Sequence, residues 1–146
     1  MSNRLKPQPY AGGSERAPRV LIVEDDALIA WDMSLSLQAA GFEVREIGVT
    51  GAAALAQAAA VDPDLIVMDV NLRAGMDGIA AAHALRACGV HARIIFVTGF
   101  GDADTAARIG AFNPDGFLLK PVLPAALAAA VRRVLRVRPV EAETPG

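Results

Sequence analysis

The chain has 146 residues, of which 53% are hydrophobic, a length that fits one compact domain with a sizeable core but no second folded domain. A formal net charge of −2 and a pI near 5.6 give no broad basic surface, which argues against nucleic acid as a direct partner. A membrane is disfavoured too, because no apolar stretch reaches the roughly 18 residues that a spanning helix needs.

Both ends of the chain have the composition of tails, and the middle has that of one domain. Residues 1–18 combine prolines, glycines and scattered charge without apolar periodicity, so we expect a flexible tail there and a second one at residues 139–146. From residue 19 to residue 138, short apolar runs alternate with alanine-rich stretches of helical character. This alternation is typical of βαβ units and predicts a parallel sheet.

Four apolar runs predict strands, and they occupy residues 20–23, 65–68, 94–97 and 117–119. Each run is apolar on both faces, which is typical of strands in the middle of a parallel sheet that helices cover on both sides. Residues 42–47 instead alternate apolar and charged side chains, so we expect a half-exposed strand at an edge of the sheet.

The helical stretches carry start and stop signals. The first helix is expected to begin with Asp25 or Asp26 as its N-cap and to end before Gly41, with Trp31 available for core or interface packing. The other helices are expected at residues 52–60, 77–88 and 102–112, and from Leu123-Pro124 onward. Cys88, the single cysteine, is expected to be buried near a helix end, and its lack of a disulfide partner fits a reducing cytoplasm. The prediction is a doubly wound α/β fold with a five-stranded parallel sheet and five helices.

Polar side chains follow the ends of the four apolar runs: Glu24 and Asp25, then Asp69, Thr98 and Lys120. Because the carboxyl ends of parallel strands converge at one edge of a sheet, we expect these side chains to lie close together. Like charges about 4 Å apart repel by roughly 1–4 kcal/mol, so the acids need positive charge beside them. Lys120 supplies one charge, and an all-oxygen set of carboxylates, waters and a backbone carbonyl suits Mg²⁺.

These residue types predict phosphoryl chemistry. With a cation bound, the carboxylate of Asp69 can attack phosphorus and form an acyl phosphate. Lys120 and the cation would then neutralise the charge of the phosphoryl oxygens, and the Thr98 hydroxyl would donate a hydrogen bond. His83 and His91 have no partner at metal-ligand spacing, so zinc is not expected.

On these residues the chain resembles the receiver domain of two-component response regulators, the CheY-like fold, over about residues 19–138. The resemblance implies that Asp69 is the phospho-acceptor, that Glu24 and Asp25 are the Mg²⁺ pair, and that Lys120 is the phosphate partner. It also implies three further roles, which are a metal-ligating backbone carbonyl, a switch hydroxyl and an aromatic switch on the last strand: Asn71, Thr98 and Phe117. The Lys120–Pro121 bond is similar to the cis peptide of the family.

Three features qualify the resemblance. The loop after the acceptor, residues 71–78, has Arg73 where the family usually has proline and is about one residue longer, which leaves the phosphoryl lifetime open. Phe117 has no hydroxyl, so any switching by this ring would depend on packing alone. Residues 96–100, Phe-Val-Thr-Gly-Phe, resemble a branch of receivers with a Phe-Ala-Thr-Gly motif that often works with HWE-type histidine kinases.

The resemblance implies a stand-alone, cytoplasmic response regulator that accepts a phosphoryl group from a histidine kinase or phosphotransfer protein. No DNA-binding output domain, nucleic acid, membrane or enzymatic turnover is expected beyond Mg²⁺-dependent self-phosphorylation and dephosphorylation. The output would be phosphorylation-dependent binding of a downstream protein, read on residues 109–136. The cognate kinase, the target, dimerisation on phosphorylation, and the choice between signal transmitter and phosphate sink stay open.

Three other functions are compatible with this fold class, and each meets an obstacle in the sequence. A Mg²⁺-dependent phosphohydrolase of the haloacid-dehalogenase kind needs a second acid two residues after the nucleophile, where this chain has Asn71. A flavodoxin-like nucleotide binder needs a phosphate cradle after the first strand, where Glu24, Asp25 and Asp26 would repel phosphate. An unphosphorylated adaptor with the receiver fold has the complete residue set against it, although that set does not exclude it.

Overall fold

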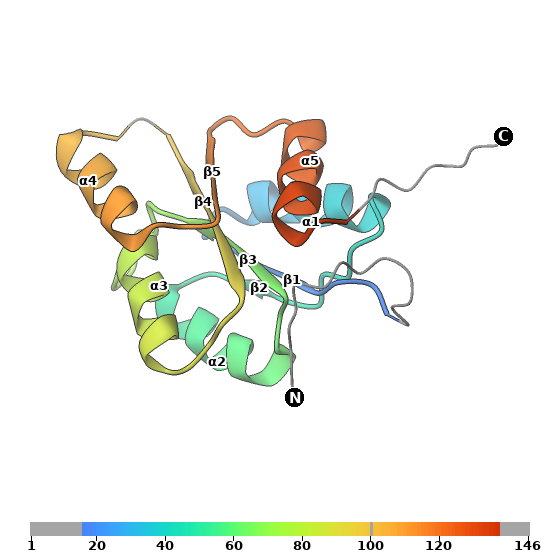
Figure 1. Cartoon of the computed structure of the whole chain (residues 1–146), viewed down its shortest axis with the longest axis horizontal. Coiled ribbons are helices and arrows are strands. Elements are labelled where there is room, and N and C mark those ends of the chain that lie inside the picture. The colour runs from blue at the N-terminus through green and yellow to red at the C-terminus, as the bar shows by residue number, and fades with distance from the viewer. Residues whose placement is uncertain (1–15, 100, 138–146) are drawn as a thin grey trace, which may run out of the picture.

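The computed structural model describes residues 16–99 and 101–137, and these form one parallel sheet with helices on both faces (Figure 1). The strands are β1 (Val20–Val23), β2 (Ile47–Gly48), β3 (Leu65–Asp69), β4 (Arg93–Thr98) and β5 (Gly116–Leu119). The helices are α1 (Ala27–Ala39), α2 (Gly51–Val61), α3 (Gly78–Ala87), α4 (Ala103–Phe112) and α5 (Pro124–Leu135). The strand order β2-β1-β3-β4-β5 confirms the expected doubly wound α/β fold.

Alternate side chains of the central strands enter two separate cores, because successive residues of a strand point to opposite faces of the sheet. Leu21, Ile66 and Phe96 belong to the core beneath α2 and α3. Ile22 and Val67, one position along, belong to the core beneath α1 and α5. Each central strand is therefore covered on both faces, which explains why its sequence is a continuous apolar run.

Both edges of the sheet differ from the sequence-based expectation. β2 is an edge strand as predicted, but it pairs only at Ile47–Gly48, and an isolated bridge joins Arg19 to Glu43 further back. β5 forms the other edge and not a central strand, with Phe117 46% and Leu119 56% exposed. The reason lies in α4, which packs through the partly buried Ile109 and Phe112 and has no buried residue in its ten positions.

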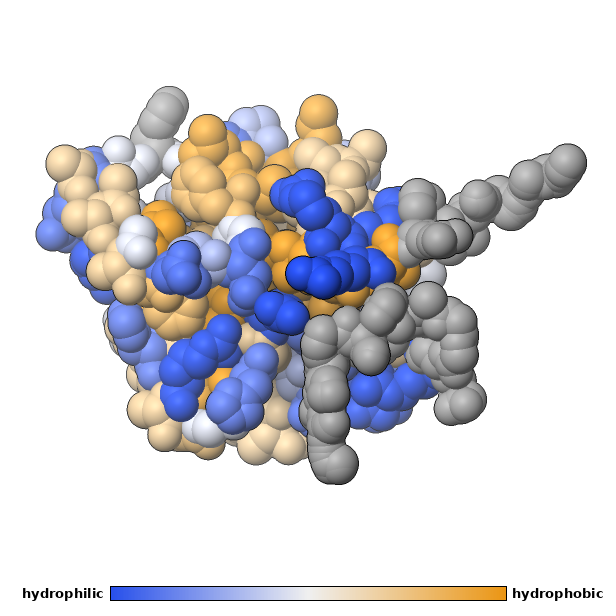
Figure 2. Space-filling model, in the orientation of Figure 1, coloured by the Kyte–Doolittle hydropathy of each residue, from blue (hydrophilic) through white to orange (hydrophobic). Residues whose placement is uncertain are grey.

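Apolar surface gathers over β5 and the start of α5 on the face shown in Figure 2, where Phe117, Leu119 and Leu123 are exposed. Hydrophilic residues cover the later part of α5, which carries Arg132 and Arg133 in its last turn. On the inner side of the same helix Leu127 and Val131 are buried, as the sequence pattern predicts.

Four helices have a capping side chain at their start, and the cap of α1 is Asp26, one of the two residues that the sequence offered. Asp26 accepts hydrogen bonds from the backbone N–H groups of Leu28 and Ile29, and Asp77 accepts one from Ala80. Thr50 and Asp102 cap α2 and α4 in the same way.

One single-residue expectation about burial was wrong. Cys88 is exposed, because it is the C-cap of α3 at an end of the helix that faces solvent. Trp31 is 58% exposed on the outer side of α1, so it is not a core residue, and the alternative role in interface packing stays a prediction.

Of the tail expected at residues 1–18, residues 1–15 lie outside the described residues, as do residue 138 and the whole tail expected at residues 139–146. Residues 16–18 are bonded to the domain: the Pro18 carbonyl accepts from the Glu43 N–H, and Arg16 forms an ion pair with Asp64. Among the described residues, no helix combines the length and the apolarity needed to cross a bilayer.

Candidate functional site

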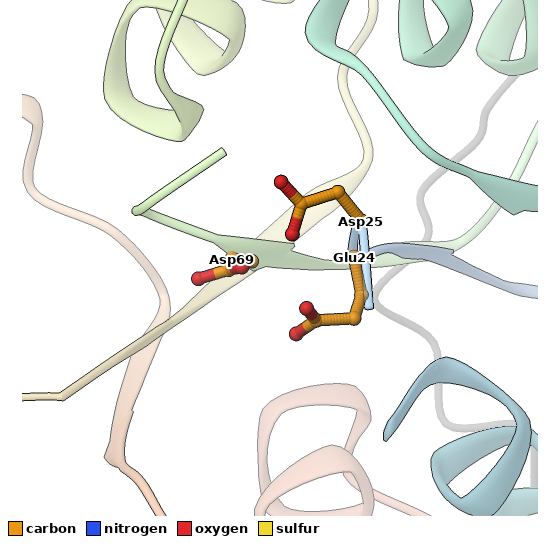
Figure 3. Close-up of side chains that lie close together, drawn as sticks. All are labelled: Glu24, Asp25 and Asp69. Carbon is orange, nitrogen blue, oxygen red and sulfur yellow. The ribbon is translucent and has the colours of Figure 1, made fainter. Parts of the chain in front are cut away.

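Three carboxylates meet at the carboxyl edge of the sheet. Glu24 and Asp25 directly follow β1, and Asp69 is the last residue of β3, which pairs with β1 in parallel register. One carboxylate oxygen of each residue lies within 4.8 Å of the others. Figure 3 shows the three side chains leaving neighbouring strand ends toward a common space. Glu24 and Asp69 are 1% and 2% exposed, so two of these charges lie in a site nearly closed to water.

Lys120, which directly follows the carboxyl end of β5, brings a positive charge into this cluster. Its Nζ lies 3.3 Å from Asp69 Oδ1 and 3.4 Å from Glu24 Oε1. Its backbone N–H donates to the Thr98 carbonyl, which continues the β4–β5 ladder, and the following Lys120–Pro121 peptide is cis. The ammonium is the one cation among the described residues that forms ion pairs with both buried acids.

The charges shift each other's ionisation. Burial raises the pKa of Glu24 above its usual 4.5, and the charge of Asp69 adds to this, against the opposing effects of the Asp26 N–H and Lys120. Burial by itself would lower the pKa of Lys120, but the negative charges of Asp69 and Glu24 outweigh it and raise that pKa above 10.5. The site therefore holds its lysine firmly charged and disfavours charge on Glu24.

Thr98 and Asn71 border Asp69. The Thr98 hydroxyl is buried at the end of β4 and donates to Asn71 Oδ1 at 3.3 Å. The Asn71 backbone N–H in turn donates to Asp69 Oδ1 at 3.0 Å. The predicted switch hydroxyl thus lies two hydrogen bonds from the acceptor carboxylate. The predicted metal-binding role of the Asn71 backbone carbonyl stays a prediction.

Close packing holds the loop between β3 and α3 next to Asp69. A Cβ added to Gly78 would lie 2.0 Å from the Asp69 carbonyl oxygen, so only glycine fits at the start of α3. Met76 packs so closely on Gly51 that a Cβ there would lie 2.6 Å from its Cγ. Packing thus holds this loop at Met76 and at Gly78, in its last part.

Two arginine contacts in this region were missed from the sequence. The Arg73 backbone N–H donates to Asp25 Oδ2 at 2.9 Å, and its Nε forms an ion pair with the same oxygen at 3.2 Å. Arg108 of α4 donates to both oxygens of Asp77, at 2.8 and 3.0 Å, and this bond lowers the pKa of Asp77. The sequence marked Arg73 only as a departure from the family pattern, and no spacing signal links Arg108 to Asp77.

Phe117, the predicted aromatic switch, lies on β5 with 46% of its surface exposed. Among the described residues, no hydrogen bond or aromatic contact links Phe117 to Glu24, Asp25 or Asp69. Its role as a switch stays a prediction. Phe100, the last residue of the 96–100 motif, lies outside the described residues.

The donor set fits a hard divalent cation. Glu24 Oε1 is buried and accepts no hydrogen bond from the described residues, with only the ion pair to Lys120 beside it. A buried carboxylate oxygen with spare capacity, next to two further carboxylates, is the ligand type that Mg²⁺ takes. The acidic pocket formed by Glu24, Asp25 and Asp69 could therefore hold a metal ion.

Comparison with known proteins agrees with this geometry. The chain is 34% identical over 122 residues to the transcriptional regulatory protein PrrA of Mycobacterium leprae, covering 84% of this chain and 52% of PrrA. It is 35% identical over 119 residues to the DNA-binding response regulator MtrA of Mycolicibacterium paratuberculosis, covering 81% of this chain and 51% of MtrA. The chain thus spans about half the length of the curated relatives it matches.

Solved receiver structures share the fold. A CheY-like response regulator receiver domain protein from Methanospirillum hungatei superposes with a TM-score of 0.76 at 27% identity, covering 82% of this chain and 94% of that one. The chemotaxis protein CheY4 of Vibrio cholerae gives 0.74 at 32% identity, with coverages of 81% and 98%. The family model for the response regulator receiver domain matches residues 20–132, the same part of the chain. The chain therefore belongs to the response regulator receiver domain family, as its strand-end residues predict.

Proposed function

We propose that this receiver accepts a phosphoryl group on Asp69 from a histidine kinase or a histidine phosphotransfer protein. One observation carries the proposal: the Asp69 carboxylate is 2% exposed, is paired with Lys120 at 3.3 Å, and lies within 4.8 Å of two further acids. An Asp69 oxygen would form the bond to phosphorus while the bond from phosphorus to the donor imidazole breaks. Lys120, in direct contact with Asp69, can hold the incoming negative charge.

A magnesium ion fits the proposal. Glu24, Asp25 and Asp69 would hold it with their carboxylates, and Asn71 with its backbone carbonyl. When bound, it would neutralise charge on the phosphoryl oxygens. The remaining work falls to the chain itself: Lys120 orients Asp69, and the Thr98 hydroxyl can exchange its bond to Asn71 for one to the phosphoryl group.

The output that we propose is phosphorylation-dependent binding of another protein. Phosphorylation adds about 1.5–2 negative charges and strong acceptor oxygens, enough to draw Thr98 inward and free space for Phe117. The exposed apolar residues of β5 and the start of α5 lie next to Lys120, at the surface that such a change would reach. Acting in the cytoplasm, the protein would transfer its group stoichiometrically and would not turn over a separate substrate.

Two narrower points concern the type of kinase and the binding of DNA. The pairing with HWE-type kinases depends on residues 96–100 alone. The named functions of PrrA and MtrA include regulation of transcription and DNA binding, but the matched region is a receiver, so we do not extend DNA binding to this chain.

The test is intact-protein mass spectrometry after incubation with acetyl phosphate and MgCl₂. The unchanged protein should gain the mass of one phosphoryl group, and Asp69→Asn should gain none. Asp26→Asn is the matched control, since Asp26 caps α1 beside the cluster and its amide can still cap. A mass gain that persists in Asp69→Asn, or no gain in the unchanged protein, would contradict the proposal.

A further inference from the structure

Arg73 contacts the acid pair in a way that no other described arginine does. Its backbone N–H and its Nε both reach Asp25 Oδ2, at 2.9 and 3.2 Å. The Asp25 side chain is 15% exposed and that of Arg73 is 76% exposed, so the guanidinium lies at the solvent-facing mouth of the site. It stands on the loop directly after the acceptor, four residues beyond Asp69.

This contact changes the charge balance of the site. Glu24, Asp25 and Asp69 bring three carboxylates together, and Lys120 already pairs with two of them. Among the described residues Asp25 forms no ion pair with Lys120, and Arg73 is its cation. The third acid is therefore compensated by a side chain of the chain itself before any metal arrives.

We infer that Arg73 is a tethered competitor that weakens binding of a divalent cation by occupying Asp25. The inference rests on the proposed function, because it takes the acid cluster to be the Mg²⁺ site. A cation that uses Asp25 must share or displace the guanidinium, and two cations on one carboxylate repel each other. The side chain is free to leave, because it is mostly exposed and its ion pair is of the weak surface kind.

The backbone contact of Arg73 has the opposite effect on cation binding from that of its side chain. The Arg73 N–H orients Asp25 and carries no net charge, and any residue except proline at this position would keep it. The side chain and the backbone can thus be separated by substitution. Arg73→Gln removes the charge and keeps the N–H, whereas Arg73→Lys keeps both charge and N–H.

The experiment measures Mg²⁺ binding directly by isothermal titration calorimetry, with no phosphodonor present. We expect Arg73→Gln to bind Mg²⁺ about two- to fivefold more tightly than the unchanged protein, the range that an exposed ion pair supports. Arg73→Lys should stay near the unchanged protein. Added NaCl should reduce the difference, since exposed charges are screened. Arg133→Gln is the matched control, an exposed arginine in the last turn of α5.

The outcomes separate this inference from the proposed function. If the unchanged protein binds Mg²⁺ and Arg73→Gln binds it equally well or more weakly, the competitor role is wrong while the metal site stands. If Arg133→Gln shows the same gain, the effect is one of net charge and the inference is likewise overturned. If neither the unchanged protein nor Arg73→Gln binds Mg²⁺, the metal site and the inference both fail.

Discussion

Replacing Lys120 by methionine tests whether its ammonium holds the acid cluster together. Methionine keeps an apolar stem of similar length and removes the charge. At the observed 3.3 Å from Asp69, Coulomb's law gives about 1.3 kcal/mol in bulk water and about 5 kcal/mol at an effective dielectric of 20. The Lys120 side chain is 27% exposed, so screening places the pair between these limits. We expect Lys120→Met to lose about 2–3 kcal/mol of unfolding free energy at neutral pH without metal.

The loss should depend on pH in a defined direction. The pKa of Lys120 is raised above 10.5, so its ammonium stays charged at all lower pH values, and this charge and its stabilising effect are lost only as pH rises through that raised pKa. The pKa of Glu24 is raised above 4.5, so its favourable contribution is present at low pH and is lost as pH rises through its folded-state pKa. On acidification below neutral pH, Glu24 therefore becomes neutral, one repelling charge disappears, and the variant recovers.

Urea unfolding followed by circular dichroism, at neutral pH and near pH 5 without Mg²⁺, measures both effects. The difference between Lys120→Met and the unchanged protein should shrink at the lower pH. An equal loss at both pH values, or no loss at neutral pH, would refute the reasoning, because the ammonium would then not be compensating ionised Glu24 and Asp69.

Two further predictions concern the packing around the site. Gly78→Ala should lose about 3 kcal/mol or more of unfolding free energy in the same urea assay, because the new Cβ meets the Asp69 backbone, which cannot move aside. The control is Gly110→Ala in α4, whose new Cβ meets nothing within 4 Å. It should gain about 0.5–1 kcal/mol of unfolding free energy. Similar effects of the two substitutions would contradict the close approach. Arg108→Gln should speed amide hydrogen exchange in α4 but not in β3, because it removes the bonds to Asp77 that tie α4 to α3. Those bonds lower the pKa of Asp77, so they stabilise the protein above pH 3.8 and lose this effect as pH falls through the lowered pKa. Unchanged exchange in α4 at neutral pH would show that the Arg108–Asp77 pair does not hold α4 in place.

The central part of the fold was predictable because burial on both faces leaves a direct mark in the sequence. The runs at residues 20–23, 65–68 and 94–97 correspond to β1, β3 and β4 to within a residue at either end. The edges were harder. Residues 42–47 have the right alternation, yet apart from an isolated bridge at Glu43 the strand pairs only at Ile47 and Gly48. The apolar run of β5 suggested burial that α4 does not provide.

The candidate site divides in the same way. Glu24, Asp69 and Lys120 could be placed together because topology alone brings parallel strand ends to one edge. The contact of Arg73 with Asp25 depends on the path of a loop, and a loop's path is set by packing such as that of Met76 on Gly51. Such contacts leave no periodic signal in the chain, so only the three-dimensional structure reveals them.

Asp69 and Lys120, the two principal partners of the site, are held by strands of unequal rigidity. Asp69 ends β3, a strand hydrogen-bonded on both sides, by β1 and by β4. Lys120 directly follows β5, which is bonded to β4 alone and has exposed outer side chains. The carboxylate of Asp69 is thus held by a rigid central strand, and it faces a lysine that is held by a more flexible edge strand. A displacement that begins at the lysine can travel outward along the free edge of the sheet without breaking any ladder in its interior.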